Sequence, residues 1–473
     1  MRMTRLTPLV AVVAALALAI SMMRSLSSCQ GQEAVAPAGW DAVPAVLQRI
    51  KPPVFPDGAV TVDRFGARGD GETDCKPAFD QAIASCARAG GGRVIVSQGE
   101  WLVNGPIHLK SGVELHLMAG ATVRFSTNPA HYLPAVFTRF EGTELMNYSP
   151  LVYAIDQENV AITGEGTLDG QAGPTAWWPW KGPWGGEVNH GWREGAPNQL
   201  ADVQRLGELS DAAAPPAERV FGDKGFLRPS FVQFYRCKNV LIEGVTVTNA
   251  PMWLLHPVLC ENVTIRGVTV RSHGPNNDGC NPESCRDVLV ENCTFDTGDD
   301  CIAIKSGRNT DGRRLARPSE NIVIRGCTMK DGHGGVTLGS EMSGGIRNVF
   351  VEDCSMSSPR LDRAIRLKSN SLRGGFLENL FVRNIRVGEV SDAVIHIDLR
   401  YNDETGEHNP VVRNLFIDGV QSQKSGRPLY LLGIEGQPIQ NVLVTNSRFE
   451  NAAKPSVIEY VDELVLRNVT QPE

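Results

Sequence analysis

The sequence predicts an all-β protein: a right-handed parallel β-helix with a helix capping its N-terminal end. The first observation is a repeat that opens with asparagine and continues with alternating apolar residues, its later copies starting 22 to 35 residues apart. The second is that each copy holds two short β-rich runs divided by a small polar residue, without a helical pattern between copies. Such a period is typical of a stacked solenoid, and parallel crossovers are almost always right-handed.

The repeat has the pattern Asn-Val-x-Ile/Val-x-Gly/Asn/Asp-Val/Cys-Thr, and it first occurs at Asn159. Because the copies continue almost to the end of the chain, we expect residues 59–473 to form a single elongated domain. The later copies start at Asn239, Asn262, Asp287, Asn321, Asn348, Asn379, Asn414 and Asn441, with a faded one at Glu463.

Residues 1–29 are expected to be an export signal of the lipoprotein type. Arg2 and Arg5 precede the apolar run Leu9 to Ile20, which is short for a membrane span. Leu26-Ser27-Ser28-Cys29 resembles a bacterial lipoprotein cleavage box, so an acylated Cys29 would be the one link to a membrane. This reading predicts the periplasm or the outer membrane. Ordinary secretion and a retained anchor are the alternatives.

The domain is expected to open with a strand, a helix and further strands. Residues 30–58 are interpreted as a tether and lead-in. A helix is expected at 77–89, since Pro77 suits a first turn, one face is apolar, and Gly90-Gly91-Gly92 would stop it. That helix would cover the open end of the β-helix and blunt an edge that could otherwise aggregate.

The cysteines align with the repeat better than they pair. Cys237, Cys260 and Cys285 fall in one column. A second column exchanges cysteine for valine or isoleucine, as buried thiols do when they act as small hydrophobes. We expect mostly free thiols, with Cys280–Cys285 and Cys75–Cys86 as possible disulfides in an exported protein.

A long insertion at 170–228 interrupts the repeat. It holds five of the eight tryptophans, among them Trp177 and Trp178. One interpretation is a hydrophobic cluster that holds the loop together. The other is a wall that stacks on sugar rings, because an indole can cover a pyranose face while its N–H is hydrogen-bonded. We expect Trp177 and Trp178 to contact a substrate.

The formal charge is −7 over 473 residues. This excludes a broadly basic surface, so we expect no nucleic-acid partner. An acidic polymer would also be repelled at long range unless a local cluster of cations received it. We expect a monomer.

Four short motifs follow four consecutive copies of the repeat. Each alone has an ordinary explanation as a turn, a solvated corner or an exposed strand edge. In a solenoid, however, residues that follow successive copies stack along one face, so these motifs are expected to form one site. They are Asn276-Asn277-Asp278-Gly279, Gly298-Asp299-Asp300-Cys301, Gly332-His333-Gly334 and Arg366-Leu367-Lys368.

Neighbouring carboxylates suit acid–base catalysis. Their repulsion raises the pKa of one member, so one carboxyl can hold a proton while another stays ionised. Cleavage of a glycosidic bond needs such a set, with an acid for the leaving oxygen and a carboxylate for water or the sugar. Arg366 and Lys368 are two apart on a strand, face the same side and could hold a uronate carboxylate.

The order of these motifs resembles that of the polygalacturonase family of glycoside hydrolases, family 28, and the run from Gly339 to Gly345 resembles its bacterial exo-acting members. The resemblance runs from about Val60 to about Tyr401 and includes the opening segment Val62 to Gly71. It implies a right-handed parallel β-helix that hydrolyses α-1,4-galacturonan, a pectic cell-wall polysaccharide, with inversion and without a cofactor or metal. Asn277 and Leu367 depart from the residues usual in the family, at supporting positions.

The resemblance also implies roles for the site residues. Asp299 would be the general acid, Asp278 and Asp300 would activate water, and His333 would tune the acid. Arg366 and Lys368 would hold the galacturonate carboxylate. Tyr401 resembles a substrate-contacting tyrosine, and Asn276 is expected to shape the substrate site.

Other activities remain open at this stage. A non-catalytic β-helix that binds glycans would have no need of all three carboxylates. A pectate lyase would share the architecture but depend on calcium, and rhamnogalacturonan or xylogalacturonan could replace galacturonan. Exo-action is favoured over endo-action, since the insertion is long enough to close a groove and Gly339-Ser340-Glu341-Met342-Ser343-Gly344-Gly345 resembles exo-acting bacterial members.

Overall fold

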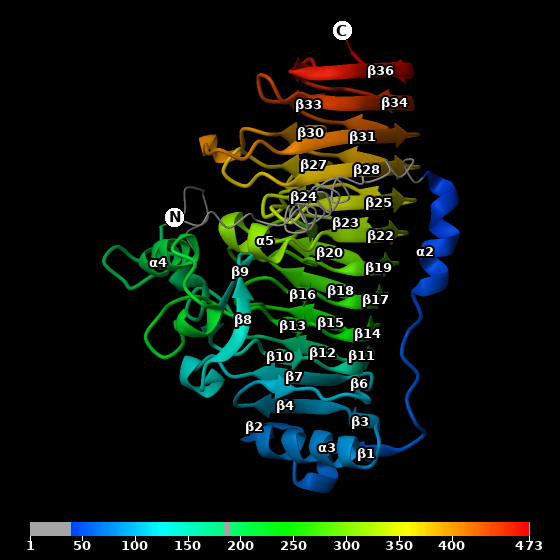
Figure 1. The fold of residues 1–473 in the computed structure, drawn as a ribbon. Coiled ribbons are helices and arrows are strands. Elements are labelled where there is room, and N and C mark those ends of the chain that lie inside the picture. The colour runs from blue at the N-terminus through cyan, green and yellow to red at the C-terminus, as the bar shows by residue number, and fades with distance from the viewer. Residues whose placement is uncertain (1–38, 184–189, 473) are drawn as a thin grey trace, which may run out of the picture. The chain divides into compact units, whose positions relative to one another are not determined.

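The computed structural model describes residues 39–183 and 190–472 (Figure 1). The chain divides into two units, Met1–Ala38 and Gly39–Glu473. The expected signal segment with Cys29 lies outside the described residues, as do Trp184 and the first part of the expected tether. Among the helices that the structure describes, none is long and apolar enough to cross a membrane.

Most strands belong to one long parallel sheet of 24 strands, in which each strand pairs with its equivalent on the next coil. Its strands are β1 (Ala59–Thr61), β2 (Asp70–Asp74), β3 (Gly92–Val96), β4 (Gly99–Val103), β6 (Val113–Leu117), β7 (Ala121–Phe125), β11 (Glu158–Gly164), β12 (Thr167–Asp169), β14 (Lys238–Glu243), β15 (Thr246–Thr248), β17 (Glu261–Arg266), β18 (Thr269–Ser272), β19 (Arg286–Glu291), β20 (Thr294–Thr297), β22 (Ser319–Arg325), β23 (Thr328–Met329), β25 (Ile346–Glu352), β26 (Ser355–Met356), β28 (Phe376–Arg383), β29 (Arg386–Glu389), β31 (Val411–Asp418), β32 (Gln421–Lys424), β34 (Ile439–Phe449) and β36 (Val461–Thr470).

A second row of parallel strands, the short-strand face, closes each coil. It consists of a four-stranded and a six-stranded sheet, which meet through single bridges at Cys280 and Glu283. Together the two rows form the expected parallel β-helix. The strands of this face are β5 (Ile107–His108), β10 (Val152–Ile155), β13 (Val232–Tyr235), β16 (Leu255–Val258), β21 (Ile302–Ile304), β24 (Val336–Gly339), β27 (Ile365–Lys368), β30 (Ala393–Asp398), β33 (Arg427–Leu432) and β35 (Val457–Glu459).

The repeated asparagine has a clear physical role. Asn348, Asn379 and Asn414 have φ values of +56°, +63° and +62°, a left-handed conformation that asparagine tolerates better than most residues. The Nδ2 of Asn379 donates to Oδ1 of Asn348, and Asn414 donates to Asn379, both at 3.0 Å. The repeat therefore encodes a turn and a ladder that holds neighbouring coils in register.

Apolar residues stack in columns inside and outside the coils. Phe350, Phe381 and Phe416 stack with ring centroids 5.1 Å apart at each step. The ten described cysteines are all buried and free, so the proposed Cys280–Cys285 and Cys75–Cys86 disulfides do not form in the structure. Buried thiols act here as core residues, as the column alignment predicted.

The predicted N-terminal helix forms α3 (Lys76–Arg88). Its apolar face, which includes Phe79 and Ile83, is buried. Figure 1 shows the helix at the β1 end of the stack, where it packs against β1 and β3. The helix covers the apolar end of the first coil, as expected.

The second half of the expected tether is structured instead. The segment forms η1 (Trp40–Ala42) and α2 (Val43–Arg49), which lie against the long sheet. Arg49 Nη2 lies 2.7 Å from Asp287 Oδ1, and Asn262 Oδ1 accepts from Lys51 N at 2.7 Å. The segment thus covers the ladder between Asn262 and Asp287, where an aspartate takes the place of the repeated asparagine. A tether was predicted because contacts so distant in sequence leave no local pattern.

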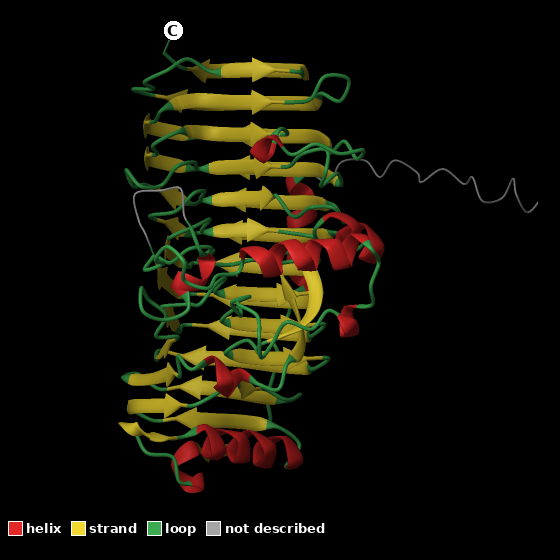
Figure 2. Cartoon of the chain, turned by 90° about the vertical axis from the view of Figure 1, so that its left-hand side faces the viewer, coloured by secondary structure: helices red, strands yellow, loops and turns green. Residues whose placement is uncertain are grey.

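Several elements outside the coils were not predicted. An antiparallel hairpin, β8 (Val136–Phe140) and β9 (Thr143–Asn147), and α4 (Leu200–Asp211) of the insertion lie on one side of the stack, which Figure 2 faces. Helix α5 (Asn309–Leu315) lies between two repeat copies where no helix was expected. The remaining short helices are η2 (Val62–Phe65), η3 (Pro129–Tyr132), η4 (Trp178–Lys181), η5 (Pro216–Glu218) and η6 (Tyr401–Asp403).

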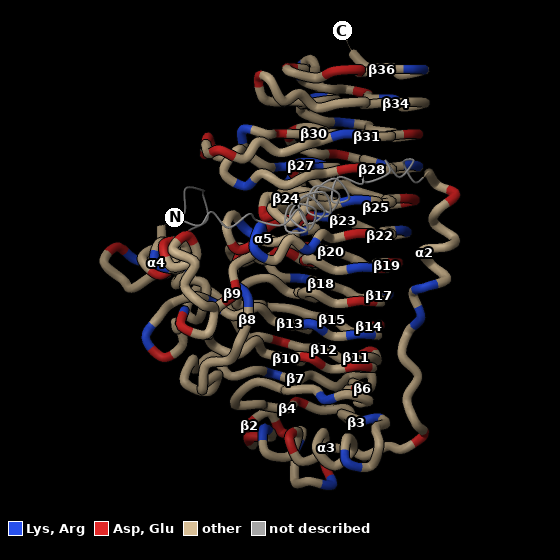
Figure 3. The backbone as a smooth tube through the Cα atoms, viewed as in Figure 1, with Lys and Arg blue, Asp and Glu red and all other residues tan. Residues whose placement is uncertain are grey.

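Acidic and basic residues are interspersed along the coils (Figure 3). Many pair between neighbouring coils, such as Arg325 with Glu291 and Arg383 with Glu352. These exposed or half-buried pairs add little stability individually, but they keep the surface free of a large field of one sign.

The asparagine ladder can be tested at Asn379. Replacement by glycine removes two ladder hydrogen bonds but tolerates the positive φ, and we expect a loss of about 1–3 kcal/mol in the free energy of unfolding. Replacement by alanine adds the strain of the left-handed conformation, about 1 kcal/mol more. Chemical denaturation of both variants measures the difference. Equal stability of Asn379→Gly and the unmodified protein would show that the ladder contributes nothing.

Candidate active site

The four predicted motifs meet on the short-strand face of the β-helix. They come from consecutive coils, as the spacing of the repeat implied. The positions are Asp278 just before the Cys280 bridge, Asp299 and Asp300 just before β21, His333 just before β24, and Arg366 and Lys368 within β27.

These residues surround a cleft of about 270 Å³. Seven of the ten predicted site residues line it, namely Asn276, Asp278, Asp299, His333, Arg366, Lys368 and Tyr401. Asp300 is wholly buried and is bound to two of the lining side chains. A larger hollow of about 730 Å³ lies between residues 53–59 and β3 and β6, but its buried Glu114 is paired with Arg93. The smaller cleft, which holds the predicted acids, histidine and cations, is therefore the candidate active site.

Asp299 and His333 form a charged pair. Nδ1 of His333 lies 2.9 Å from Oδ1 of Asp299. Burial alone would raise the pKa of Asp299, but His333, Lys368 and Arg366 outweigh burial and hold this pKa well below its ordinary value. In return, the charge of Asp299 raises the pKa of His333 to about 9. The pair therefore holds one proton at neutral pH, on the imidazole.

Asp278 has the opposite shift. Burial, with the charges of Asp299 and Asp300, raises its pKa to about 8, while Lys305 and Lys368 oppose the rise. Its Oδ2 accepts from Asn281 Nδ2 at 2.7 Å. Asp278 thus gives up its proton less readily than Asp299 does, and the proton shared with Asp299 favours the histidine.

Asp300 is the ionised floor of the cleft. Lys368 Nζ donates to its Oδ2 at 2.8 Å, and Arg366 Nη1 donates to its Oδ1 at 3.2 Å. Burial would raise the pKa of Asp300, but Lys368 and Arg366 hold it below its ordinary value. The two cations also lie 5.3 and 5.7 Å from the ring centroid of Tyr401. They therefore bind an internal carboxylate besides facing the cleft, which the sequence did not indicate.

The predicted tryptophans have other surroundings. Trp177 is 2% exposed and packs edge-on against Tyr132 and Trp180. Trp178 donates from Nε1 to the carbonyl of Ala250 at 2.9 Å, and its indole fills the space where Gly274 lacks a side chain. Neither lines the cleft. Packing is the role these contacts support, since tryptophan enrichment in a sequence does not separate a folded cluster from a sugar wall.

Asn276 is tied to the insertion. Its Oδ1 accepts from Arg228 Nη2 at 2.7 Å, and Arg228 Nη1 donates to the carbonyl of Pro275 at the same distance. The buried Arg228 thereby fixes the turn that carries Asp278. This agrees with a shaping role for Asn276 and leaves its amide oxygen already occupied.

The hairpin and the insertion form one wall of the cleft. Glu141, at the hairpin tip, accepts from Arg308 Nη1 at 2.7 Å, and both line the cleft with Lys181 of the insertion. Buried pairs hold the wall in place: Arg139 Nη1 lies 3.0 Å from Glu283 Oε1, and Arg219 Nη1 lies 2.9 Å from Asp311 Oδ1. The wall is therefore a fixed part of the site.

Sequence reasoning missed a second group of cleft residues. They follow strands of the short-strand face by one to six residues, and a systematic search of those positions for charged side chains would have found them. Glu341 lies in the glycine- and serine-rich run singled out from the sequence, but no role was assigned to it. The group comprises Lys305, Arg308, Glu341, Arg373 and Glu404.

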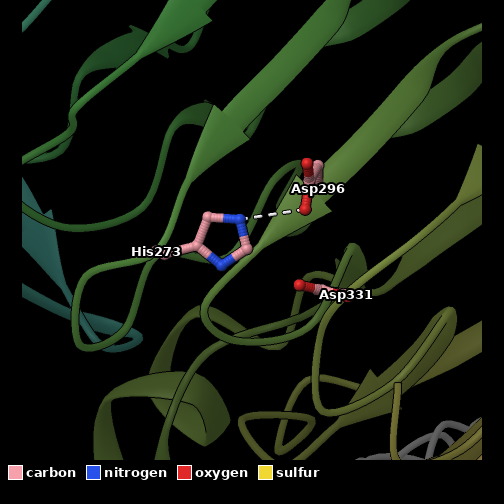
Figure 4. A group of neighbouring side chains, drawn as sticks. All are labelled: His273, Asp296 and Asp331. Carbon is pink, nitrogen blue, oxygen red and sulfur yellow. Dashed lines mark ion pairs between the residues drawn. The ribbon is translucent and has the colours of Figure 1, made fainter. Parts of the chain in front are cut away.

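A histidine and two aspartates form a separate group outside the cleft. Figure 4 shows His273, Asp296 and Asp331 with ligand atoms turned toward one another, all within 4.8 Å. His273 Nε2 lies 2.9 Å from Asp296 Oδ1. One oxygen of Asp331 pairs with Arg360, and the other accepts from Ser358. Both oxygens of Asp331 thus already have partners. We therefore interpret this group as side chains held by ion pairs and hydrogen bonds, and we assign no metal to it.

Comparison with known protein families identifies the class. The family described as glycosyl hydrolases family 28 matches residues 221–467, and that described as rhamnogalacturonase A/epimerase, pectate lyase-like, matches residues 59–122. The first match spans more than half of the chain and includes all four motifs of the cleft. The chain belongs to glycosyl hydrolases family 28 and is therefore a glycoside hydrolase.

Three individual proteins show which members of the family this chain is similar to. A probable polygalacturonase of Vitis vinifera is 27% identical over an alignment of 416 residues that covers 84% of this chain and 75% of that protein. An exo-poly-alpha-D-galacturonosidase of Dickeya chrysanthemi is 28% identical over 73% of this chain and 58% of its own length. The crystal structure of a hyperthermoactive exopolygalacturonase from Thermotoga maritima superposes with a TM-score of 0.88 at 48% identity, covering 91% of this chain and 95% of that one.

The pKa shifts predict the pH dependence of kcat/KM, which reports groups of the free enzyme. If Asp278 must be ionised, the acid limb lies above the ordinary pKa of an aspartate, because burial raises the pKa of Asp278. If the Asp299–His333 pair must hold its proton, the alkaline limb lies above the ordinary pKa of histidine, because Asp299 raises that of His333. A profile of kcat/KM from pH 3 to 11 measures both limbs.

His333→Gln is the matched variant for this profile, because it keeps hydrogen-bonding capacity but cannot carry the proton. It should move the alkaline limb to lower pH, because only Asp299 itself can then hold the proton. An unchanged alkaline limb in this variant would contradict the assignment.

Proposed function

We propose that this enzyme removes galacturonate units from the end of α-1,4-linked galacturonan chains, with inversion of configuration. The observation that carries the proposal is the meeting of three carboxylates, a histidine and two cations in one cleft. Family membership and the 48% identity to an exopolygalacturonase support the choice of substrate and the exo mode.

A uronate ligand fits the charge of the cleft. The chain has a net charge of −7, yet Lys181, Lys305, Arg308, Arg366, Lys368 and Arg373 all line this small volume. Charge-assisted hydrogen bonds from such groups to a carboxylate are each worth about 1.5–3 kcal/mol. We propose that Arg366 and Lys368, beside Tyr401, hold the carboxylate of the sugar at the cleavage point.

The acid–base steps follow from the pairs in the cleft. Asp299 donates a proton to the glycosidic oxygen as the bond to C1 breaks, and His333 supplies that proton through the 2.9 Å contact. Asp278 and Asp300 accept the proton of a water that attacks C1 from the opposite face. This scheme requires Asp278 to be ionised, so the cations next to it matter for the rate.

The exo mode is supported by the fixed wall. Glu141 and Lys181 face the cleft from the hairpin and the insertion, and the Glu141–Arg308 pair joins the hairpin tip to the coil that carries Asp299. We propose that this wall prevents a long chain from passing through, so only a terminus enters. Endo-action is the alternative, and curated relatives at 24% identity include endo-polygalacturonases.

We further propose that the protein is exported and acts as a monomer, attached to a membrane only through a lipid on Cys29. The arginine-led apolar segment followed by Leu26-Ser27-Ser28-Cys29 supports export and the lipid attachment. Labelling with a radioactive fatty acid tests this, since Cys29→Ser should abolish the label and leave the protein unacylated.

The mode of attack is tested by following viscosity and reducing ends together on long polygalacturonate. Exo-action should release mono- or digalacturonate while the viscosity falls slowly, because each cut shortens the chain by only one or two units. Asp299→Asn should lose activity by roughly 10²- to 10⁴-fold, since an amide cannot donate the proton.

This variant is the control for a contaminating activity in the same preparation. A rapid fall in viscosity after few cuts, absent from Asp299→Asn, would show that the unmodified enzyme cuts internally and that the wall leaves the cleft open.

A further inference from the structure

A buried lysine that the scheme above leaves without a role lies next to Asp278. Lys305 directly follows β21, and its side chain is only 3% exposed. Its Nζ donates to Glu341 Oε2 at 2.8 Å and to the carbonyl of Gly339 at 3.3 Å. The same atom lies 3.6 Å from Asp278 Oδ2. An ammonium has three donors, so two are used and the third faces Asp278.

The surroundings hold this ammonium at one point. Nζ lies 4.6 Å from the ring centroid of Trp253, which covers it from another side of the cleft. Glu341 is itself fixed, because its Oε1 accepts from Ser340 Oγ at 3.1 Å. A buried cation held by a carboxylate, a carbonyl and an aromatic ring has little freedom to move away from Asp278.

We infer that Lys305 is a positioning residue for the candidate base: its ammonium favours the ionised form of the Asp278 carboxyl and holds it in place, and Glu341 fixes the ammonium. This inference rests on the proposed function, in which Asp278 accepts a proton from water. Asn281 completes the arrangement, since its Nδ2 binds the oxygen of Asp278 that faces Lys305.

The charges around Asp278 explain why a cation is needed. Asp278 is 3% exposed and lies near the charges of Asp299 and Asp300, so burial and repulsion both favour its protonated form. Lys305 is the leading opposing charge. Besides Lys305, the charges that act on Asp278 are those of Asp299, Asp300 and Lys368. Lys305 is acted on by Glu341, Asp278 and Asp300. Besides Lys305, Glu341 is acted on by Arg373 and Arg308.

A purely structural role is the competing explanation. The Lys305–Glu341 pair connects the segments after β21 and β24, and removing one partner alone leaves a buried charge uncompensated. A single substitution could therefore lower activity through misfolding. The double variant Lys305→Met/Glu341→Gln removes both charges, so neither is left buried without its partner, and it therefore separates the two explanations.

The experiment compares the unmodified full-length enzyme, Lys305→Met and the double variant. Galacturonate release gives kcat/KM against pH, and thermal unfolding reports folding. Infrared spectra of each enzyme, recorded against pH and compared with those of its Asp278→Asn counterpart, measure the protonation of the Asp278 carboxyl. This measurement does not depend on activity. We expect the acid limb and the Asp278 titration to move to higher pH by about one unit in both variants. At one pH unit below the apparent pKa of the acid limb of the unmodified enzyme, kcat/KM of the variants should then be about tenfold lower than that of the unmodified enzyme. This difference should disappear as the pH rises.

Other results would overturn the inference. In the double variant, an unmoved acid limb and an unmoved Asp278 titration would show that Lys305 and Glu341 only join two coils. A uniform loss of rate at every pH, with the titration unchanged, would lead to the same conclusion. If the unmodified enzyme releases no galacturonate, the proposed substrate is wrong, and the infrared titration still decides whether Lys305 sets the ionisation of Asp278.

Discussion

Parallel stacking holds equivalent residues on neighbouring coils about 5 Å apart, and the rest of this molecule depends on that spacing. Asparagines repeated at one position become a ladder, as Asn379 and Asn414 show, and phenylalanines become a stack. The same rule gathers polar residues that follow successive coils. Side chains far apart in sequence, such as Asp299 and His333, come within 2.9 Å without a specialised loop.

The spacing that assembles the site also creates its main electrostatic difficulty. Three carboxylates are brought together in a buried cleft, where like charges cannot all remain ionised without compensation. Each carboxylate has its own neighbour of opposite charge: Lys368 and Arg366 for Asp300, His333 for Asp299, and Lys305 for Asp278. The compensation differs in strength, so the pKa of Asp278 is raised while those of the other two fall. Unequal compensation thus leaves Asp278, the proposed base, harder to ionise than its two neighbours, so its ionisation depends on the cations beside it.

The sequence was most informative where structure repeats. The coils, the column of cysteines and α3 could be predicted because each follows from a local pattern with a fixed period. The hairpin β8–β9 could not, since it is held by contacts such as Arg139 with Glu283, which are 144 positions apart. Lys305 was missed because one lysine at the end of a strand is usually an exposed edge. Trp177 was assigned to the substrate because a sequence does not show which aromatic rings face inward.

The central claim is that Asp299 and the water-activating carboxylates Asp278 and Asp300 act on opposite faces of the same sugar. Proton NMR during the first minutes of hydrolysis of a short oligogalacturonide tests it directly, because the anomeric signals of the new reducing sugar are read before they equilibrate. The account predicts that the β-anomer appears first from the α-linked substrate, as a single displacement by water requires. Initial appearance of the α-anomer would contradict it.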